Sequence, residues 1–448
     1  MEKLFKLKEH GTTVRTEIMA GFTTFLAMAY ILVVNPLMLS GADAGVQLMD
    51  YNAVFLATAI SSAVATLCMA FFANYPVALS AGMGLNAYFT YSVCLGMGVS
   101  WRVALTAVFV EGIIFIILSL FKFRETLVNT VPANLKYGIT AGIGLFIALI
   151  GFKGAGVVVA SSSTLVDLGK MTSPEFVLAM VGLLIIAALH HKNVKGSVLI
   201  GILVTWVLGM GAQAIGWYQG NSLLPNFSNW TLFPVVQEST ILQFDFAWVG
   251  QNLLSFAVIV FSFLFVDIFD TVGTLIGVAS KGNLLDKDGK LPKVGGALMA
   301  DAVGTVVGAC LGTSTITSFV ESSAGVSEGG RTGLTSVTVA VLFILSIFLY
   351  PIFTAIPSFA TAPALVFVGL LMMSSVKKMT FEGDIADTVG GYLAVIMMPF
   401  TYSIANGIMF GMLSWVILKV VTGKAKDIHP VMWIAALLFA LRVITMVL

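Results

Sequence analysis

The chain has 448 residues, of which 58% are hydrophobic and only 10% are charged, and its formal net charge is +1. Soluble domains carry about 25% charged residues, so this composition excludes an ordinary soluble enzyme and predicts an all-α polytopic membrane protein embedded in the lipid bilayer. The near-neutral balance also offers no basic surface to nucleic acid.

Apolar stretches long enough to cross a bilayer recur along the whole chain, about seven in each half. The first half holds Ile18–Leu39, Ala53–Phe72, Val77–Val93, Val103–Phe121, Tyr137–Phe152, Phe176–His190 and Val198–Ile215. The second half holds Trp248–Ile268, Val294–Leu311, Thr315–Val326, Leu334–Tyr350, Ala360–Met373, Ala386–Thr401 and Gly407–Val421. An odd number of spans per half inserts the second half upside down, so we expect two inverted seven-span repeats.

These stretches divide the chain into an N-terminal segment (1–17), a first repeat (18–215), a connection (216–247), an inverted second repeat (248–421) and a C-terminal part (422–448). Lys and Arg gather in alternate connections, beginning with the N-terminal segment, which predicts a multi-pass protein of the cell membrane with a cytoplasmic N-terminus and an extracellular 216–247 connection. The apolar tail Val431–Leu448 is interpreted as either a further span or an interfacial helix.

Each half contains a short segment interrupted by glycine, SAGMGLNAYF at Ser80–Phe89 and TSFVESSAG at Thr317–Gly325. Paired broken segments at matching positions indicate a binding site near the bilayer midplane. In the first segment, Gly84 permits close approach of the backbone, and the Asn86 amide can both donate and accept a hydrogen bond. The alternative is that the glycines only allow tight helix packing.

Carboxylates lie inside stretches that are otherwise apolar enough for a bilayer. Asp267 and Asp270 are one helical turn apart, and Glu321 lies in the second broken segment. An ionisable group at membrane depth costs roughly 2.5–3.5 kcal/mol and usually faces a protein interior or a watery pathway. We therefore predict that Asp270 and Glu321 bind a substrate and that Asp267, Asp270 and Glu321 include the proton-coupling group. Asp267 has the alternative role of supporting Asp270.

Other polar residues have weaker indications. Thr23 and Phe25 of the first span are candidates to line the binding site. Glu111 and Asp301 favour structural hydrogen bonds between helices. The three cysteines lie in apolar stretches without metal-binding spacing, so we predict no metal site and no cofactor apart from a coupling ion.

Five motifs together resemble the AzgA-type purine permeases, a branch of the nucleobase–cation symporter family 2 that is related to the nucleobase–ascorbate transporters. The motifs are HGTTVRTEIMAGFTTFLAMAYILVVNP (His10–Pro36), GMGLNAYF (Gly82–Phe89), FDTVGT (Phe269–Thr274), LGTSTITSFVESSAGV (Leu311–Val326) and GGRTGLT (Gly329–Thr335). The resemblance runs from about Leu4 to Lys426.

The resemblance implies a proton-coupled importer of adenine, guanine or hypoxanthine that works by elevator-type alternating access, with H⁺ as the coupling ion. It implies fourteen spans in a core domain and a gate domain, with strands and half-helices in the third and tenth spans. The family's third-span glycine and asparagine fall on Gly84 and Asn86, its eighth-span acids on Asp267 and Asp270, and its tenth-span glutamate on Glu321. Because relatives often form dimers, a homodimer is also an expectation.

Other classes of membrane protein fit the sequence less well. An intramembrane aspartyl protease needs a GxGD-type motif, which FDTVGT lacks, and a channel needs a selectivity ring, which is not visible. A related uracil or xanthine carrier remains open, whereas clustered acids disfavour an anion carrier. The GMGLNAYF motif and TAPAL (Thr361–Leu365) favour hypoxanthine and guanine over adenine, although an adenine-selective permease of the same family remains the alternative.

Overall fold

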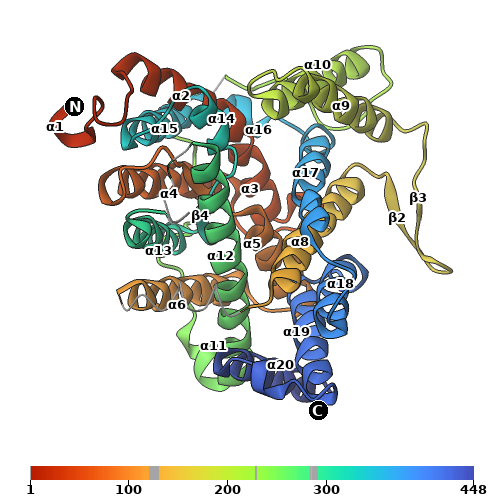
Figure 1. Cartoon of the computed structure of the whole chain (residues 1–448). Coiled ribbons are helices and arrows are strands. Elements are labelled where there is room, and N and C mark those ends of the chain that lie inside the picture. The colour runs from red at the N-terminus through yellow and green to blue at the C-terminus, as the bar shows by residue number, and fades with distance from the viewer. Residues whose placement is uncertain (1, 121–130, 228–229, 283, 285–290, 448) are drawn as a thin grey trace.

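The structure is a computed structural model that describes residues 2–120, 131–227, 230–282, 284 and 291–447 (Figure 1). The first half contains α1 (Glu2–Phe5), α2 (Val14–Met28), α3 (Ile31–Leu39), η1 (Ala42–Ala44), α4 (Tyr51–Phe72), β1 (Leu79–Ala81), α5 (Met83–Ala87), the π-helix η2 (Tyr88–Gly96), α6 (Trp101–Leu120), α8 (Ala133–Gly154), β2 (Val158–Ser161), β3 (Leu165–Leu168), α9 (Pro174–His191) and α10 (Ser197–Ala214).

The second half contains α11 (Phe246–Gln251), α12 (Leu253–Lys281), α13 (Val294–Leu311), β4 (Ile316–Ser318), α14 (Ser322–Ser327), α15 (Gly333–Ser346), η3 (Ile347–Leu349), α16 (Tyr350–Thr354), α17 (Ser358–Met373), η4 (Ser374–Lys378), α18 (Ile385–Phe400), α19 (Ile404–Val421), η5 (Ala425–Asp427) and α20 (Pro430–Val447). Within the described residues, ten helical stretches are long and apolar enough to cross a membrane. With α12, α18 and the two broken segments, they match the spans expected from the sequence one by one, which confirms the polytopic helical fold.

The helices contact each other in the mirrored pairs that inverted repeats require. Helix α4 packs on α15 as α13 packs on α6, and α2 packs on α14 and α15 as α12 packs on α5 and α6. Likewise α8 packs on α18 as α17 packs on α9. Figure 1 shows the resulting division: a core domain of α2–α6 and α12–α15, beside a gate domain of α8–α10 and α17–α19.

The two broken segments meet in the core domain through a short antiparallel pair of strands. β1 pairs with β4 so that Leu79 lies opposite Ser318 and Ala81 opposite Ile316. Two threonines satisfy the outer edges of this pair. The hydroxyl of Thr66 in α4 donates to the Leu79 carbonyl at 3.1 Å and accepts from its N–H at 3.0 Å.

The hydroxyl of Thr305 in α13 makes the same two bonds to Ile316, at 3.1 and 3.2 Å. Irregular backbone inside a membrane protein is tolerated only where such partners exist, because an unpaired peptide group in an apolar interior costs several kcal/mol. Thr66 and Thr305 therefore perform equivalent roles in the two repeats, and they fix the crossing point of the strands.

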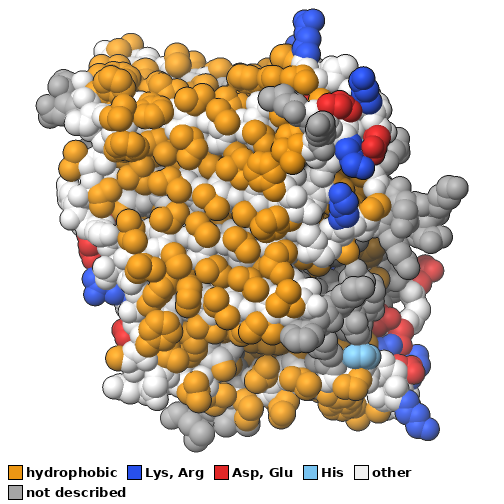
Figure 2. Space-filling model, turned by 90° about the vertical axis from the view of Figure 1, so that its left-hand side faces the viewer, with side chains coloured by type: hydrophobic (Ala, Val, Ile, Leu, Met, Phe, Trp, Pro, Cys, Tyr) orange, Lys and Arg blue, Asp and Glu red, His pale blue; other side chains and the backbone are white. Residues whose placement is uncertain are grey.

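Apolar side chains cover the outer surface. Figure 2 shows hydrophobic side chains across the face on which α4, α6 and α13 lie, with charged groups gathered beyond its edges. Large apolar residues such as Phe71, Val341 and Leu345 are about half exposed there or on adjoining helices. A continuous apolar surface of this kind would aggregate in water and is typical of a lipid-facing belt.

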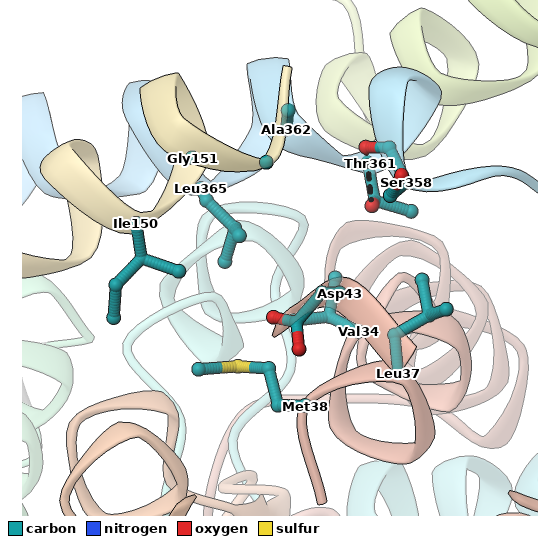
Figure 3. Close-up of a pocket in the computed structure, with 11 residues that line it drawn as sticks. Val34, Leu37, Met38, Asp43, Ile150, Gly151, Ser358, Thr361, Ala362 and Leu365 are labelled. Atoms are coloured by element: carbon teal, nitrogen blue, oxygen red, sulfur yellow. Dashed lines mark hydrogen bonds between the residues drawn. The ribbon is translucent and has the colours of Figure 1, made fainter. Parts of the chain in front are cut away.

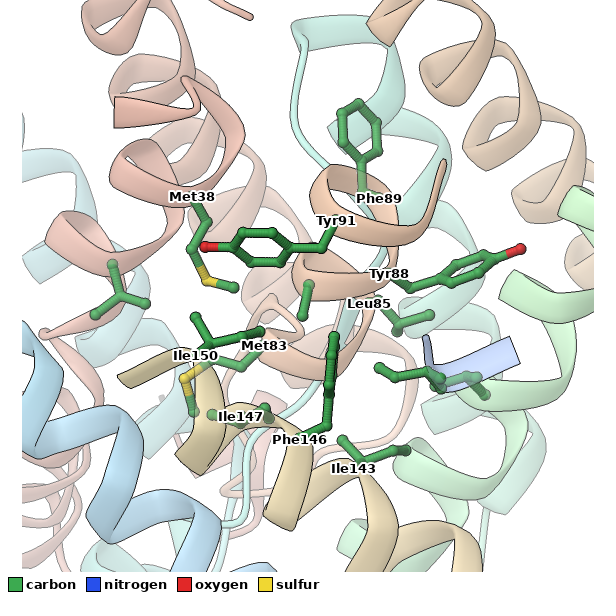
Figure 4. Close-up of a cluster of buried hydrophobic side chains, with 14 of the residues drawn as sticks. Met38, Met83, Leu85, Tyr88, Phe89, Tyr91, Ile143, Phe146, Ile147 and Ile150 are labelled. Atoms are coloured by element: carbon green, nitrogen blue, oxygen red, sulfur yellow. The ribbon is translucent and has the colours of Figure 1, made fainter. Parts of the chain in front are cut away.

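Aromatic and aliphatic side chains fill the interface between the core and gate domains. Figure 4 shows Tyr88, Phe89 and Tyr91 of η2 above Phe146 and Ile147 of α8. All five are buried. The η2 segment of the core domain therefore rests on an apolar surface of α8.

The structure adds detail to the expected elements or corrects them in four places. The chain is not all helical apart from the broken segments, because β2 and β3 form a hairpin between α8 and α9 that we did not predict. The first span is two helices, interrupted at Ala29 and Tyr30. The eighth span was expected to end at Ile268, whereas α12 continues to Lys281. The apolar tail forms one helix, α20, which contacts α12 and α19.

Candidate functional site

Two glycines bring the first broken segment close to its neighbours. A Cβ atom on Gly82 would lie 2.8 Å from Oγ1 of Thr317 in β4, and one on Gly84 would lie 2.8 Å from Cγ2 of Ile143 in α8. Real Cβ atoms do not tolerate such distances, so both positions need the absence of a side chain. Gly84 thereby lets the start of α5 touch the gate domain, in the place where the two domains meet.

Asn86, one turn after Gly82, is completely buried. Its Oδ1 accepts a hydrogen bond from the hydroxyl of Ser314, which precedes β4. Its Nδ2 is buried without a hydrogen-bond partner among the described residues. Buried donors are almost always paired in native proteins, so this amide is a candidate to meet a ligand acceptor.

Asp270 and Glu321 approach the same crossing from two other elements. Asp270 of α12 is partly buried, and its Oδ2 accepts from the hydroxyl of Thr317 at 3.3 Å. Glu321, just before α14, accepts at Oε1 from the hydroxyl of Tyr30 at 2.5 Å. The structure therefore brings together Asn86, Asp270 and Glu321 around the paired strands, where carboxylate acceptors and an amide donor face one region.

Asp267 belongs to a second carboxylate group behind Asp270. The hydroxyl of Thr271 lies 3.1 Å from Oδ1 of Asp267 and 2.8 Å from Oδ1 of Asp301 in α13. Both carboxyl groups are fully buried. A hydroxyl has one hydrogen and donates to one carboxylate at a time. The Thr271 hydroxyl therefore links the carboxyl group of Asp267 on α12 to that of Asp301 on α13.

Glu111 of α6 is another fully buried acid, and its Oε2 accepts from the hydroxyl of Thr315, just before β4, at 2.8 Å. Asp301 is thus hydrogen-bonded to the neighbouring helix α12, as the sequence suggested, whereas Glu111 is bonded to the second broken segment.

The first span contributes a residue that we did not predict, Tyr30, while the lining role of Thr23 and Phe25 stays a prediction. Thr23 is buried in α2 and makes no hydrogen bond to these carboxylates in the described structure, and Phe25 packs edge-on against Phe343 of α15, with ring centroids 5.4 Å apart. Tyr30 reaches Glu321 instead. A tyrosine in an apolar span carries no sequence signal, and nothing near it predicts the interruption that places it.

Polar contacts join the core and gate domains at opposite ends of the first span. At the end where α2 begins, Lys195 of the α9–α10 connection pairs with Glu328, which follows α14. The adjacent Gly329 carbonyl accepts from Thr12, which locates this pair beside the N-terminal segment. Exposed pairs of this kind contribute about 0–1 kcal/mol, so the contact is easily broken.

At the other end, after α3, the Asp43 carboxylate accepts from the hydroxyl of Tyr91. The Tyr91 ring packs edge-on against Tyr402 of the gate domain, and Nζ of Lys153 lies 5.0 Å from the Tyr402 ring centroid. Burial raises the pKa of Asp43 to about 6, with the Tyr91 hydrogen bond and Lys153 acting in the opposite direction.

Figure 3 shows the Asp43 carboxylate beside a small cavity between α3, α8 and α17, lined in part by Ile150, Thr361 and Leu365. Its volume of about 10 Å³ holds one water molecule at most. The cavity is therefore part of the contact between the domains and too small to admit a larger solute.

Comparison with known sequences decides the family. The sequence model of a permease family, the xanthine/uracil permeases, matches residues 15–410. The chain belongs to the xanthine/uracil permease family. It is 45% identical to the guanine/hypoxanthine permease PbuO of Bacillus subtilis (strain 168), covering 98% of this chain and 99% of that protein. It is 43% identical to the adenine permease AdeP of Escherichia coli (strain K12), covering 99% and 96%. The permease is thus a transporter and not an enzyme.

Solved structures show that the fold is shared more widely. The transmembrane domain of a cyanobacterial bicarbonate transporter, BicA, superposes with a TM-score of 0.64 at 16% identity, covering 87% of this chain and 96% of that domain. The anion transporter Slc26a9 in an inward-facing state matches with a TM-score of 0.64 at 12% identity, covering 91% of this chain and 68% of that one. At such identities the likeness concerns the fold of the permease alone.

Proposed function

We propose that the permease imports purine nucleobases by proton symport, with hypoxanthine and guanine as its favoured substrates. The observation that carries the proposal is the meeting of Asn86, Asp270 and Glu321 at the crossing of β1 and β4, at the domain interface. The purine class is supported by full-length relatives named as adenine and as guanine/hypoxanthine permeases.

The chemistry of a purine suits these groups. A neutral purine is a flat disc with ring N–H donors and with carbonyl or ring-nitrogen acceptors. Glu321 and Asp270 each accept from a ring N–H, and the unpaired Nδ2 of Asn86 donates to an acceptor on the same edge. A site that hydrogen-bonds every polar edge of its substrate rejects analogues that leave one group unpaired.

The coupling proton is assigned to the carboxylates of α12 and their partners. Asp270 combines substrate binding with proton binding, and Glu321 mainly binds substrate. Asp267 lies one helical turn from Asp270 and shares the Thr271 hydroxyl with Asp301, which supports a relay role beside Asp270. H⁺ is thus the proposed coupling ion, and no other cofactor is proposed.

Alternating access is proposed to occur by movement of the core domain along the gate domain in the manner of an elevator. This proposal is supported by the two polar contacts between the domains, Lys195 with Glu328 at one end and Tyr91 with Tyr402 at the other. Each joins groups from different domains, so movement of the core domain past the gate domain must break both contacts. Alternation of the Lys and Arg residues supports a cytoplasmic N-terminus, which would put the Asp43 end outside.

The choice between purines rests on sequence detail, since relatives with the two specificities are 45% and 43% identical. The GMGLNAYF and TAPAL motifs favour hypoxanthine and guanine, with adenine as the alternative and uracil or xanthine after it. A homodimer is proposed because relatives often form dimers, and the mass of the purified permease in detergent tests it.

The test is uptake of radiolabelled hypoxanthine by a purine-transport-deficient host that expresses the permease, with unlabelled guanine, adenine, xanthine and uracil as competitors. The proposal expects saturable uptake that a protonophore abolishes and that guanine inhibits. Inhibition by adenine alone would move the substrate to the adenine branch. Absence of uptake of every base, with the protein shown in the membrane, would overturn the proposal.

A further inference from the structure

Tyr30 lies at the interruption of the first span and inside the site. Helix α2 ends at Met28 and α3 begins at Ile31, so Tyr30 sits in the turn between them. Its side chain is fully buried, one of the largest in the protein to be so. Ala29 and Tyr30 keep right-handed helical backbone angles, and from this turn the Tyr30 side chain reaches the second broken segment.

The Tyr30 hydroxyl donates to Oε1 of Glu321 at 2.5 Å. Hydrogen bonds from a neutral hydroxyl to a carboxylate at this distance belong to the short, charge-assisted class. The bond fixes the plane of the carboxyl group and uses one of its oxygens. The second oxygen, Oε2, is then the one that is available to a substrate N–H, in a direction that Tyr30 sets.

We propose that Tyr30 is a positioning residue for substrate recognition, which holds Glu321 so that Oε2 accepts the purine ring N–H. This inference rests on the proposed function. It assigns to the first span a part in specificity that the broken segments and α12 do not supply by themselves.

A purely structural role is the competing explanation, because the bond also links the first span to α14. That link does not depend on the hydroxyl. Gly325 of α14 packs directly on α2, where a Cβ atom would lie 2.1 Å from Oγ1 of Thr24 and 2.4 Å from the Ala20 carbonyl. Figure 1 shows α14 close beside α2 and α12, and both helices contact it. Removing the Tyr30 hydroxyl therefore leaves α14 in place.

The experiment is a double-mutant cycle on the purified full-length permease, with equilibrium binding of tritiated hypoxanthine as the readout. The variants are Tyr30→Phe, Glu321→Gln and the pair together. Loss of a hydrogen bond to a charged group predicts binding weakened by about 10- to 100-fold in Tyr30→Phe. Because Tyr30 acts through Glu321, adding Tyr30→Phe to Glu321→Gln should change binding by less than about twofold.

Tyr75→Phe is the matched control. Tyr75 is also a buried tyrosine of the core domain, and its hydroxyl has no hydrogen-bond partner among the described residues. It should bind hypoxanthine as the unaltered protein does, and thermal unfolding of all variants in detergent checks that they fold.

The outcomes separate the two levels of the proposal. If Tyr30→Phe binds hypoxanthine as tightly as the unaltered protein does, the role of Tyr30 alone is overturned. The same holds if Tyr30→Phe weakens binding equally in the unaltered and the Glu321→Gln backgrounds. Failure of the unaltered protein to bind hypoxanthine, guanine and adenine would overturn the purine proposal and the role of Tyr30 with it.

Discussion

Asp270 and Thr317 are 47 positions apart in the chain and are joined by a 3.3 Å hydrogen bond from the threonine hydroxyl to the aspartate. Thr317 also lies opposite Ser80 in the strand pair. One residue thus connects the acid-bearing helix α12 to the crossing of both broken segments. A carboxylate in this position contacts the strand beside the proposed substrate site.

Replacement of Asp270 by asparagine should abolish concentrative uptake. The asparagine amide keeps the size of the side chain, but it lacks the negative charge of a carboxylate and cannot bind the coupling proton. We expect uptake to fall by about 100-fold or more, since a charge-assisted bond and the coupling group are both lost. Asp167→Asn, in the exposed β3 strand, is the control and should transport normally. Full concentrative, pH-dependent uptake in Asp270→Asn would disprove the assignment.

Thr66→Val and Thr305→Val should each destabilise the strand crossing. Each substitution removes a hydroxyl that makes two bonds to one strand residue and leaves buried peptide groups unpaired. The expected cost is about 1–3 kcal/mol per site, seen as a lower melting temperature in detergent. Thr140→Val is the comparison, because Thr140 bonds only to the Lys136 carbonyl of its own helix. Equal melting temperatures for all three variants would contradict the stabilising role of Thr66 and Thr305 at the strand crossing.

Gly84→Ala should impair transport through contact with the gate domain. The new methyl group would meet Cγ2 of Ile143 at 2.8 Å and push α5 away from α8. Ile143→Ala removes the obstructing atoms, so the double variant should regain much of the lost uptake, a coupling of about 0.5–3 kcal/mol. If the double variant transports no better than Gly84→Ala, the glycine is needed for another reason.

Asp43 should make stability depend on pH between about 4 and 6. Its pKa of about 6 lies above the ordinary value, so the protein binds this proton more tightly when folded than when unfolded. The stabilising contribution is full below the ordinary pKa and is lost as pH rises through 6. The unaltered permease should therefore lose more thermal stability from pH 5 to pH 7 than Asp43→Asn does. Parallel pH profiles for both proteins would refute this prediction.

The polar residues of the site could be predicted because they stand out against an apolar background. Asn86, Asp270 and Glu321 are rare residue types at membrane depth, and their cost alone marks them. Their meeting at one crossing followed from the paired broken segments. Their proposed roles, and those of Thr23 and Phe25, stay predictions.

Other parts of the site were beyond sequence reasoning for physical reasons. Tyr30, Thr66 and Thr305 are ordinary residues of apolar helices, and their importance arises only from the long-range partners that the fold supplies. Helix α12 continues past its expected end because its acids lower the local hydropathy without interrupting the backbone hydrogen bonds of the helix. The β2–β3 hairpin was not predicted because its strands have only four residues each and lie in a connection between two spans.

The most direct measurement is uptake of radiolabelled hypoxanthine into proteoliposomes that contain the purified permease and no other protein, with an imposed proton gradient as the only driving force. With an acidic exterior, the account predicts accumulation above the external concentration, collapsing on addition of a protonophore and absent with Asp270→Asn. Equilibration of hypoxanthine to the external concentration regardless of the gradient, or exclusion of all purines, would contradict proton-coupled purine transport.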